Sequence, residues 1–192
     1  MKLSKKLIVF FVASLSLFFI VTPQSFAQAL RQPRALNAWW ADQVRYAPQR
    51  LRANISPAGT VRGVVIASPQ THNPNYFHHW IRDAALAMQE VVLLARQSPS
   101  SRDKQIYEKL LQDYVVFSRQ NQLVQTPAGL GEPIFLVNGQ IYPSPWGRPQ
   151  NDGPALRAIT LISWARDLIL KGNVDYVKKY LYQAELPAKS VI

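Results

Sequence analysis

The stretch from Gly129 to Ala158, GLGEPIFLVNGQIYPSPWGRPQNDGPALRA, most restricts the folds open to this chain. Glycines and prolines recur through it, and a proline neither continues a helix interior nor donates to the ladder of a central strand. The stretch therefore predicts a long, shaped loop, and long ordered loops in compact domains are usually functional. Its end, residues 151–154 (NDGP), has the residue types of a helix start, with a capping oxygen followed by a proline.

Residues 1–27 have the features of a secretory signal peptide. Lysines precede an apolar run from Leu7 to Val21, and the small residues Ser25 and Ala27 come just before a cut expected after Ala27. The apolar run is short for a membrane span, which favours export to a secreted or periplasmic location over a retained anchor. Residues 28–192 then form the mature segment.

The charge and the cysteine content narrow the classes of protein. Loss of Lys2, Lys5 and Lys6 with the signal peptide lowers the formal net charge from +11 to +8. The excess arginines are scattered at helical spacing without a nucleic-acid-binding motif, so we expect no nucleic-acid partner. An exported protein that binds anionic polymers or membranes is a minor alternative that rests on the charge alone. Cysteine is absent, so stability must come from the core and no thiol nucleophile is possible.

Hydrophobic periodicity predicts an all-α chain with two kinds of helix. Residues 80–96 and 154–171 are apolar almost all round, which predicts burial on both sides, whereas residues 28–53, 102–122 and 173–186 are amphipathic. Buried and amphipathic helices alternate, and long polar loops lead into the buried ones. Two concentric helical layers produce this order, as in an α/α barrel whose loops surround one mouth, but these helices are too few to close such a barrel.

A second polar loop, residues 68–80 (SPQTHNPNYFHHW), follows a short β-like run at Gly63–Ser68 and leads into the first buried helix. Arg82 and Asp83 lie in the first turn of that helix, where the dipole alone favours an acid, so a capping Asp with a structural Arg partner is one interpretation. Aromatic residues crowd the same loop and favour a sugar site instead. Sugar rings pack on flat apolar faces, and their hydroxyls pair with carboxylate and guanidinium groups.

Other candidate chemistry is sparse. Glu132 is a catalytic candidate by residue type alone, but its glycine-rich surroundings favour a role as acceptor for loop N–H groups. The histidines His72, His78 and His79 lack the spacing and carboxylate partners of a metal site, and we interpret them as loop histidines. We expect neither a metal nor a cofactor.

Two blocks carry a resemblance to a known family. Residues 63–87 (GVVIASPQTHNPNYFHHWIRDAALA) and residues 129–158 resemble the glucoamylases, glycoside hydrolase family 15, and the second block is long and specific. The resemblance covers roughly residues 34–186. It implies an (α/α)6 barrel of the six-hairpin glycosidase type, of which this chain would form the N-terminal, incomplete portion.

The resemblance also implies an activity and a set of site residues. The implied reaction releases glucose from the non-reducing ends of α-1,4-linked, starch-like chains, with inversion and without a metal. The expected partner is thus an α-glucan or malto-oligosaccharide, with no membrane partner after signal cleavage. Tyr76 would be the platform under the terminal sugar, Arg82 and Asp83 would bind its hydroxyls, and Trp146 would lie over the next subsite. Three residues are expected in supporting positions: Trp80, Arg148 and Asp152.

One departure from the family pattern bears on catalysis. An inverting glycosidase requires a general acid and a general base. In this family both come from later segments, and neither motif occurs in these 192 residues. Glu132 and Glu185 do not match the family's catalytic positions. We therefore expect these residues alone to be a truncated, inactive member of the family, and a non-catalytic carbohydrate-binding protein is the alternative.

Overall fold

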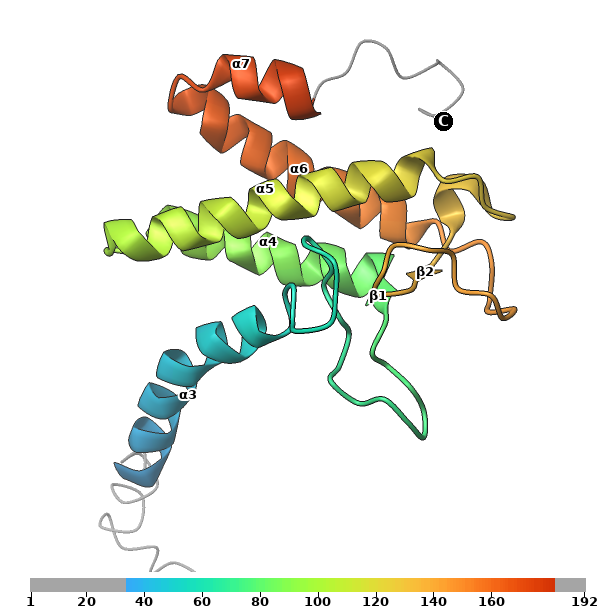
Figure 1. Ribbon diagram of the computed structural model, residues 1–192. Coiled ribbons are helices and arrows are strands. Elements are labelled where there is room, and N and C mark those ends of the chain that lie inside the picture. Colours follow the sequence, from blue (N-terminus) through green and yellow to red (C-terminus); the bar gives the residue numbers. More distant parts are fainter. Residues whose placement is uncertain (1–33, 182–192) are drawn as a thin grey trace, which may run out of the picture. The chain divides into compact units, whose positions relative to one another are not determined.

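A computed structural model describes residues 34–181 of the chain (Figure 1). The expected signal peptide and the expected end of the last helix near Leu186 lie outside these residues. The chain divides into two units, Met1–Tyr46 and Ala47–Ile192. Helix α3 (Arg34–Ala53) crosses this boundary and continues through Pro48, so this proline does not end it. In the first unit the apolar side chains expected on α3 are exposed: Leu36, Trp39, Trp40 and Val44.

Three long helices build the second unit: α4 (Ile81–Gln97), α5 (Ser101–Leu123) and α6 (Asp152–Leu170). Figure 1 shows α4 and α5 side by side, and α4 also packs against α6. Ser100 caps α5, because its hydroxyl oxygen accepts a hydrogen bond from the Asp103 N–H at 3.2 Å. One stripe of α5 is buried, as its amphipathic pattern predicts: Tyr107, Leu111, Tyr114, Val115, Phe117, Ser118 and Asn121.

The core lies where α4 meets its two neighbours. Ala84, Ala85 and Met88 on α4 are fully buried, and their i, i+3/i+4 spacing places them on one face. The Thr160 hydroxyl of α6 donates to the Ala85 carbonyl oxygen at 3.0 Å. This bond gives the buried Thr160 hydroxyl a partner on the neighbouring helix, and it fixes α6 against α4.

The prediction that both apolar helices are buried on both sides agrees with α4, which packs against α5 and α6, but is wrong for α6 among the described residues. Leu86 on α4 is exposed. On α6 only one face is buried, and Ile159, Ile162 and Ile169 on the opposite face are 52%, 68% and 50% exposed. In α6 an apolar pattern on all sides therefore coexists with burial of one face only among the described residues.

A small antiparallel ladder joins the two polar loops. Strand β1 (His79–Trp80) pairs with β2 (Ile134–Phe135), with His79 opposite Phe135 and Trp80 opposite Ile134. Successive side chains of a strand point to opposite sides, so His79 and Trp80 face different surroundings. This pairing brings the start of α4 next to the stretch that begins at Gly129.

The remaining elements are short. The β-like run at Gly63–Ser68 forms no regular strand and makes only isolated bridges, Val65 to Ile55 and Ile66 to His79. The other short elements are η1 (Gly129–Gly131), α7 (Val174–Tyr176) and η2 (Val177–Leu181). Among residues 34–181, none of the helices is long and apolar enough to cross a membrane.

Candidate functional site

A pocket of about 490 Å³ opens beside the start of α4. Its lining comes from both polar loops and from the first turn of that helix: Ala67, Tyr76, Trp80, Arg82, Asp83, Trp146 and Gln150. The two loops that the sequence expected to share one site therefore meet. The β1–β2 ladder is the physical cause, because it fastens one loop to the other.

Aromatic rings form one side of the pocket. Trp80 and Trp146 meet edge to face, with ring centroids 5.2 Å apart and planes at 87°, and Tyr76 lies 6.2 Å from Trp80. Trp146 and Tyr76 are 46% and 39% exposed, so their faces are open to a ligand. The indole nitrogen of Trp80 is buried and donates to no protein atom. Flat apolar faces that are open in this way suit a sugar ring.

Arg82 and Asp83 form the polar side of the pocket. Asp152 does not line the pocket but binds Arg82, and we call these three residues the Arg82 cluster (Arg82, Asp83 and Asp152). Arg82 Nη1 lies 3.2 Å from Asp152 Oδ2, and Arg82 Nε lies 3.7 Å from Asp83 Oδ2. The second distance is too long for a hydrogen bond. Asp83 Oδ2 is buried and accepts no hydrogen bond, although the side chain as a whole is 43% exposed. A ligand hydroxyl could therefore reach the exposed part of the Asp83 side chain but not Oδ2.

The start of α6 brings Asp152 to Arg82. A Cβ at Gly153 would lie 3.1 Å from Ile81 Cγ2, so the absence of a side chain lets the two helix starts approach. The expected cap by Asn151 does not form, because Asn151 has helical dihedral angles and makes no side-chain cap bond. Instead Asp152 Oδ1 accepts from the Gly153 N–H at 2.9 Å.

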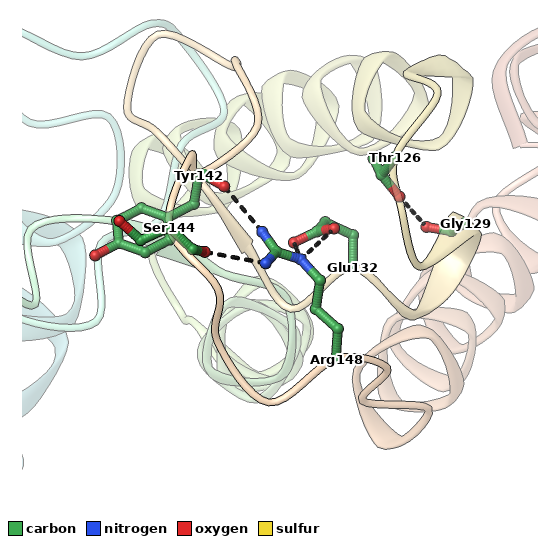
Figure 2. Close-up of polar contacts among 6 residues, drawn as sticks. All are labelled: Thr126, Gly129, Glu132, Tyr142, Ser144 and Arg148. Carbon is green, nitrogen blue, oxygen red and sulfur yellow. Dashed lines mark hydrogen bonds and ion pairs between the residues drawn. The ribbon is translucent and has the colours of Figure 1, made fainter.

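A second arginine–carboxylate pair holds the loop that carries Trp146 (Figure 2). We call Arg148, Glu132 and the carbonyl groups of Tyr142 and Ser144 the Arg148 cluster. Arg148 Nε donates to both Glu132 oxygens, at 2.7 and 2.8 Å. Its Nη1 and Nη2 donate to the carbonyl oxygens of Ser144 at 3.0 Å and Tyr142 at 2.8 Å. The Glu132 side chain is 1% exposed. The expectation that Glu132 accepts from loop N–H groups is therefore wrong, since a guanidinium binds both of its oxygens.

The interpretation of His79 as a loop histidine is also wrong. His79 is buried, its ring lies edge-on to Phe117 at 4.8 Å, and its Nδ1 accepts from the Val65 N–H at 3.0 Å. Burial, and next the positive charge of Arg157, lower the pKa of His79 to about 3. The ring is therefore neutral near pH 7. His78 stays in the loop, with its ring 5.0 Å from Tyr142, and burial lowers its pKa.

Metal ligands do not gather in the described part of the chain. Between residues 34 and 181, no group of three or more His, Cys, Asp or Glu side chains is placed to hold an ion. The groups that line the pocket are aromatic rings, one guanidinium, one carboxylate, an amide and a small apolar side chain.

Comparison with known proteins decides the family. The model of the family described as "Glycosyl hydrolases family 15" matches residues 48–185. The chain belongs to this family. All the pocket-lining residues, from Ala67 to Gln150, lie inside the matched region.

Family 15 relatives agree over a limited length. The glucoamylase of Blastobotrys adeninivorans is 41% identical over 134 residues, which are 69% of this chain and 22% of the relative. Glucoamylase-1 of Schizophyllum commune is 38% identical over 160 residues, or 78% of this chain and 27% of the relative. This chain thus spans about a quarter of the length of these relatives.

Solved structures of family 15 confirm the fold class. The glucoamylase from Hypocrea jecorina superimposes with a TM-score of 0.69 at 30% identity, over 76% of this chain and 26% of that one. The Hormoconis resinae glucoamylase gives 0.67 at 34% identity, over 74% and 26%. The described helices form part of an (α/α)6 barrel, as predicted.

The geometry sorts the predicted site residues into two groups. Tyr76, Arg82, Asp83 and Trp146 line the pocket, and so does Trp80, which was expected only in support. Two other supporting candidates, Arg148 and Asp152, do not line it but bind residues beside it. The prediction missed Ala67, a small residue at the end of a buried run, and did not single out Gln150 from the polar groups of its loop.

Proposed function

We propose that this chain forms the sugar-binding side of a glucoamylase-type site, which releases glucose from the non-reducing ends of α-1,4-glucans. The observation that carries the proposal is the pocket itself, which combines open aromatic rings with the partly exposed side chains of Arg82 and Asp83. The chain belongs to family 15, and its relatives from Blastobotrys adeninivorans and Schizophyllum commune are named glucoamylases, which supports the substrate class.

Each lining group has a role in this proposal. Tyr76 provides a platform for the terminal glucose, and Trp146 covers the next unit of the chain. Arg82 and Asp83 bind the hydroxyls of the terminal unit, with the guanidinium donating and the carboxylate accepting. The Asp83 side chain is 43% exposed and lines the pocket, so its carboxylate would accept from a sugar hydroxyl there.

We further propose that residues 1–192 bind α-glucan without hydrolysing it. Inversion requires two available carboxyl groups on opposite sides of the scissile bond. Among residues 34–181, the two carboxylates of the Arg82 cluster are both ion-paired with Arg82, and Glu132 is enclosed by Arg148. Asp83 is the one carboxylate among the described residues that line the pocket, so the pocket does not hold a pair that could act as general acid and general base.

The test titrates the purified chain with maltose and follows both binding heat and glucose release. Maltose should bind to the wild type without release of glucose, and Trp146→Ala should weaken binding about tenfold through loss of one ring contact. Trp40→Ala, which removes an exposed tryptophan of α3 instead, is the matched control and should bind normally. Absence of binding by the folded wild type would contradict the binding role, and release of glucose would contradict the inactivity.

We also propose that the protein is exported. The support is the basic, apolar and small-residue order of residues 1–27. The mass of the protein recovered outside the cytoplasm tests this directly. A product that begins at Gln28 is expected, whereas a membrane-bound product that keeps residues 1–27 would contradict export.

A further inference from the structure

The Arg148 cluster holds together the loop that carries Trp146 (Figure 2). One guanidinium binds Glu132, which precedes β2 in the chain, and the carbonyl oxygens of Tyr142 and Ser144, which follow β2. Trp146 lies between Ser144 and Arg148 in the sequence, so the loop closes around this guanidinium with the indole at its turn. The contacts that would fix the position of Trp146 are therefore made by its neighbours.

The Arg148 cluster has features of a rigid support. Glu132 is 1% exposed and Arg148 is 17% exposed, so water screens their attraction little. Behind them the two chain segments are in contact: the Gln150 N–H donates to the Gly131 carbonyl oxygen at 2.9 Å, and a Cβ at Gly131 would lie 2.7 Å from Pro149 Cβ. Only glycine permits this approach, which anchors the end of the loop next to Glu132.

The loop that the Arg148 cluster holds reaches the pocket through Trp146. Trp146 makes its edge-to-face contact with Trp80, whose own position is set by pairing in the β1–β2 ladder. Trp80 is thus held by backbone bonds, whereas Trp146 lies on a loop with 46% of its side chain exposed. Rotation of the loop about the Glu132 end would change the Trp80–Trp146 contact first.

We propose that Glu132 and Arg148 are positioning residues that set the angle of Trp146 against Trp80, and so determine how the second sugar unit of a malto-oligosaccharide is bound. This inference rests on the proposed function for its ligand. It gives the pair a task beyond stability, because a charge that merely held the loop closed would not need donors to two separate carbonyl oxygens. Arg148 meets all three partners only as a planar fork of donors.

The test uses Arg148→Lys, which keeps the charge but loses the fork. The readout is the circular-dichroism couplet of the Trp80–Trp146 pair, defined as the difference between the wild type and Trp146→Phe, since the Trp39–Trp40 pair also contributes to the raw spectrum. We expect Arg148→Lys to fold cooperatively, to lose most of this couplet and to bind maltotriose about tenfold more weakly, while binding of glucose is unchanged. If Arg148→Lys does not fold, the isosteric Glu132→Gln replaces it.

Arg96→Lys is the matched control. Arg96 also binds a carboxylate and a hydroxyl, Asp167 at 2.9 Å and Ser163 at 3.2 Å, but it does not line the sugar pocket. It should leave the couplet and both affinities unchanged. A folded Arg148→Lys with an intact couplet, or with a lost couplet and unchanged maltotriose affinity, would overturn the inference. If the wild type binds no sugar, the proposed function fails, and the couplet alone still decides whether the pair positions Trp146.

Discussion

The Arg82 cluster and the Arg148 cluster lie beside the same pocket, and both join an arginine to carboxylates. In the Arg148 cluster the carboxylate is 1% exposed and both of its oxygens accept from Nε. In the Arg82 cluster the side chains are between 43% and 49% exposed, one N–O distance is 3.7 Å, and one oxygen has no hydrogen bond. Full partnering with burial indicates a structural tie, and incomplete partnering at an open pocket indicates a group that waits for a ligand.

The largest expected effect is on stability, and it tests whether the Arg148 cluster is a structural tie. Glu132→Ala leaves the Arg148 guanidinium buried without its carboxylate, so the free energy of unfolding should fall by about 3–5 kcal/mol. Urea denaturation measures it. Glu108→Ala is the control, because Glu108 pairs with Lys171 at 2.8 Å on a half-exposed surface, and it should cost no more than about 1 kcal/mol. Equal losses in the two variants would mean that the burial of Glu132 has no energetic consequence.

The next effect is on maltose affinity, and it tests whether Asp83 of the Arg82 cluster binds the ligand. Asp83→Asn removes a partly exposed charge whose Oδ2 lies 3.7 Å from Arg82 and accepts no hydrogen bond, so stability should change little while maltose affinity falls about 10- to 100-fold. Calorimetric titration with maltose and a thermal melt separate the two quantities. Asp175→Asn, at an exposed acid of α7, serves as the control. A large loss of stability with normal affinity would instead make Asp83 a structural cap.

A third effect concerns a buried group without a carboxylate partner, His79. Its folded pKa of about 3 lies below the ordinary value of 6.5, so the unfolded chain binds the proton between these values. The contribution of His79 to stability is therefore fully present above pH 6.5 and is lost as the pH falls towards 3, with a slope of up to about 1.4 kcal/mol per pH unit.

Denaturant melts of the wild type and of His79→Phe between pH 7 and 4 measure this slope. The variant should show a flatter dependence, because phenylalanine has no proton to bind. Parallel slopes in the two proteins would show that His79 takes up no proton on unfolding in this range.

The smallest effect separates the two acids of the Arg82 cluster. Asp152→Asn breaks a 3.2 Å ion pair whose side chains are 44% and 49% exposed, so it should cost no more than about 1 kcal/mol of stability. We expect a loss of maltose affinity of only a few-fold, as Asp152 does not line the pocket. An affinity loss as large as that of Asp83→Asn would place both acids in direct contact with the ligand.

Much of the helical layout could be predicted from the sequence, because helix periodicity and breakers are local properties. The buried stripe of α5, the loop character of the stretch from Gly129 and the meeting of two aromatic loops at one site all follow the predictions. Burial of α6 could not be predicted in the same way. An apolar residue such as Ile162 indicates only that burial against another segment would be favourable. Whether such a segment covers it depends on which segments pack together, and Ile162 is exposed.

The sequence by itself determined the helices, the loop residues that a sugar site requires and the family. The tertiary structure alone decided which arginine of the chain pairs with which carboxylate, because each pairing depends on which segments come together. Glu132 and Arg148 stand 16 residues apart and Arg82 and Asp152 stand 70 apart, and no local pattern specifies which arginine meets which acid. The two-residue pairing of β1 with β2 sets this geometry, and strands so short leave too weak a pattern in the sequence to be predicted.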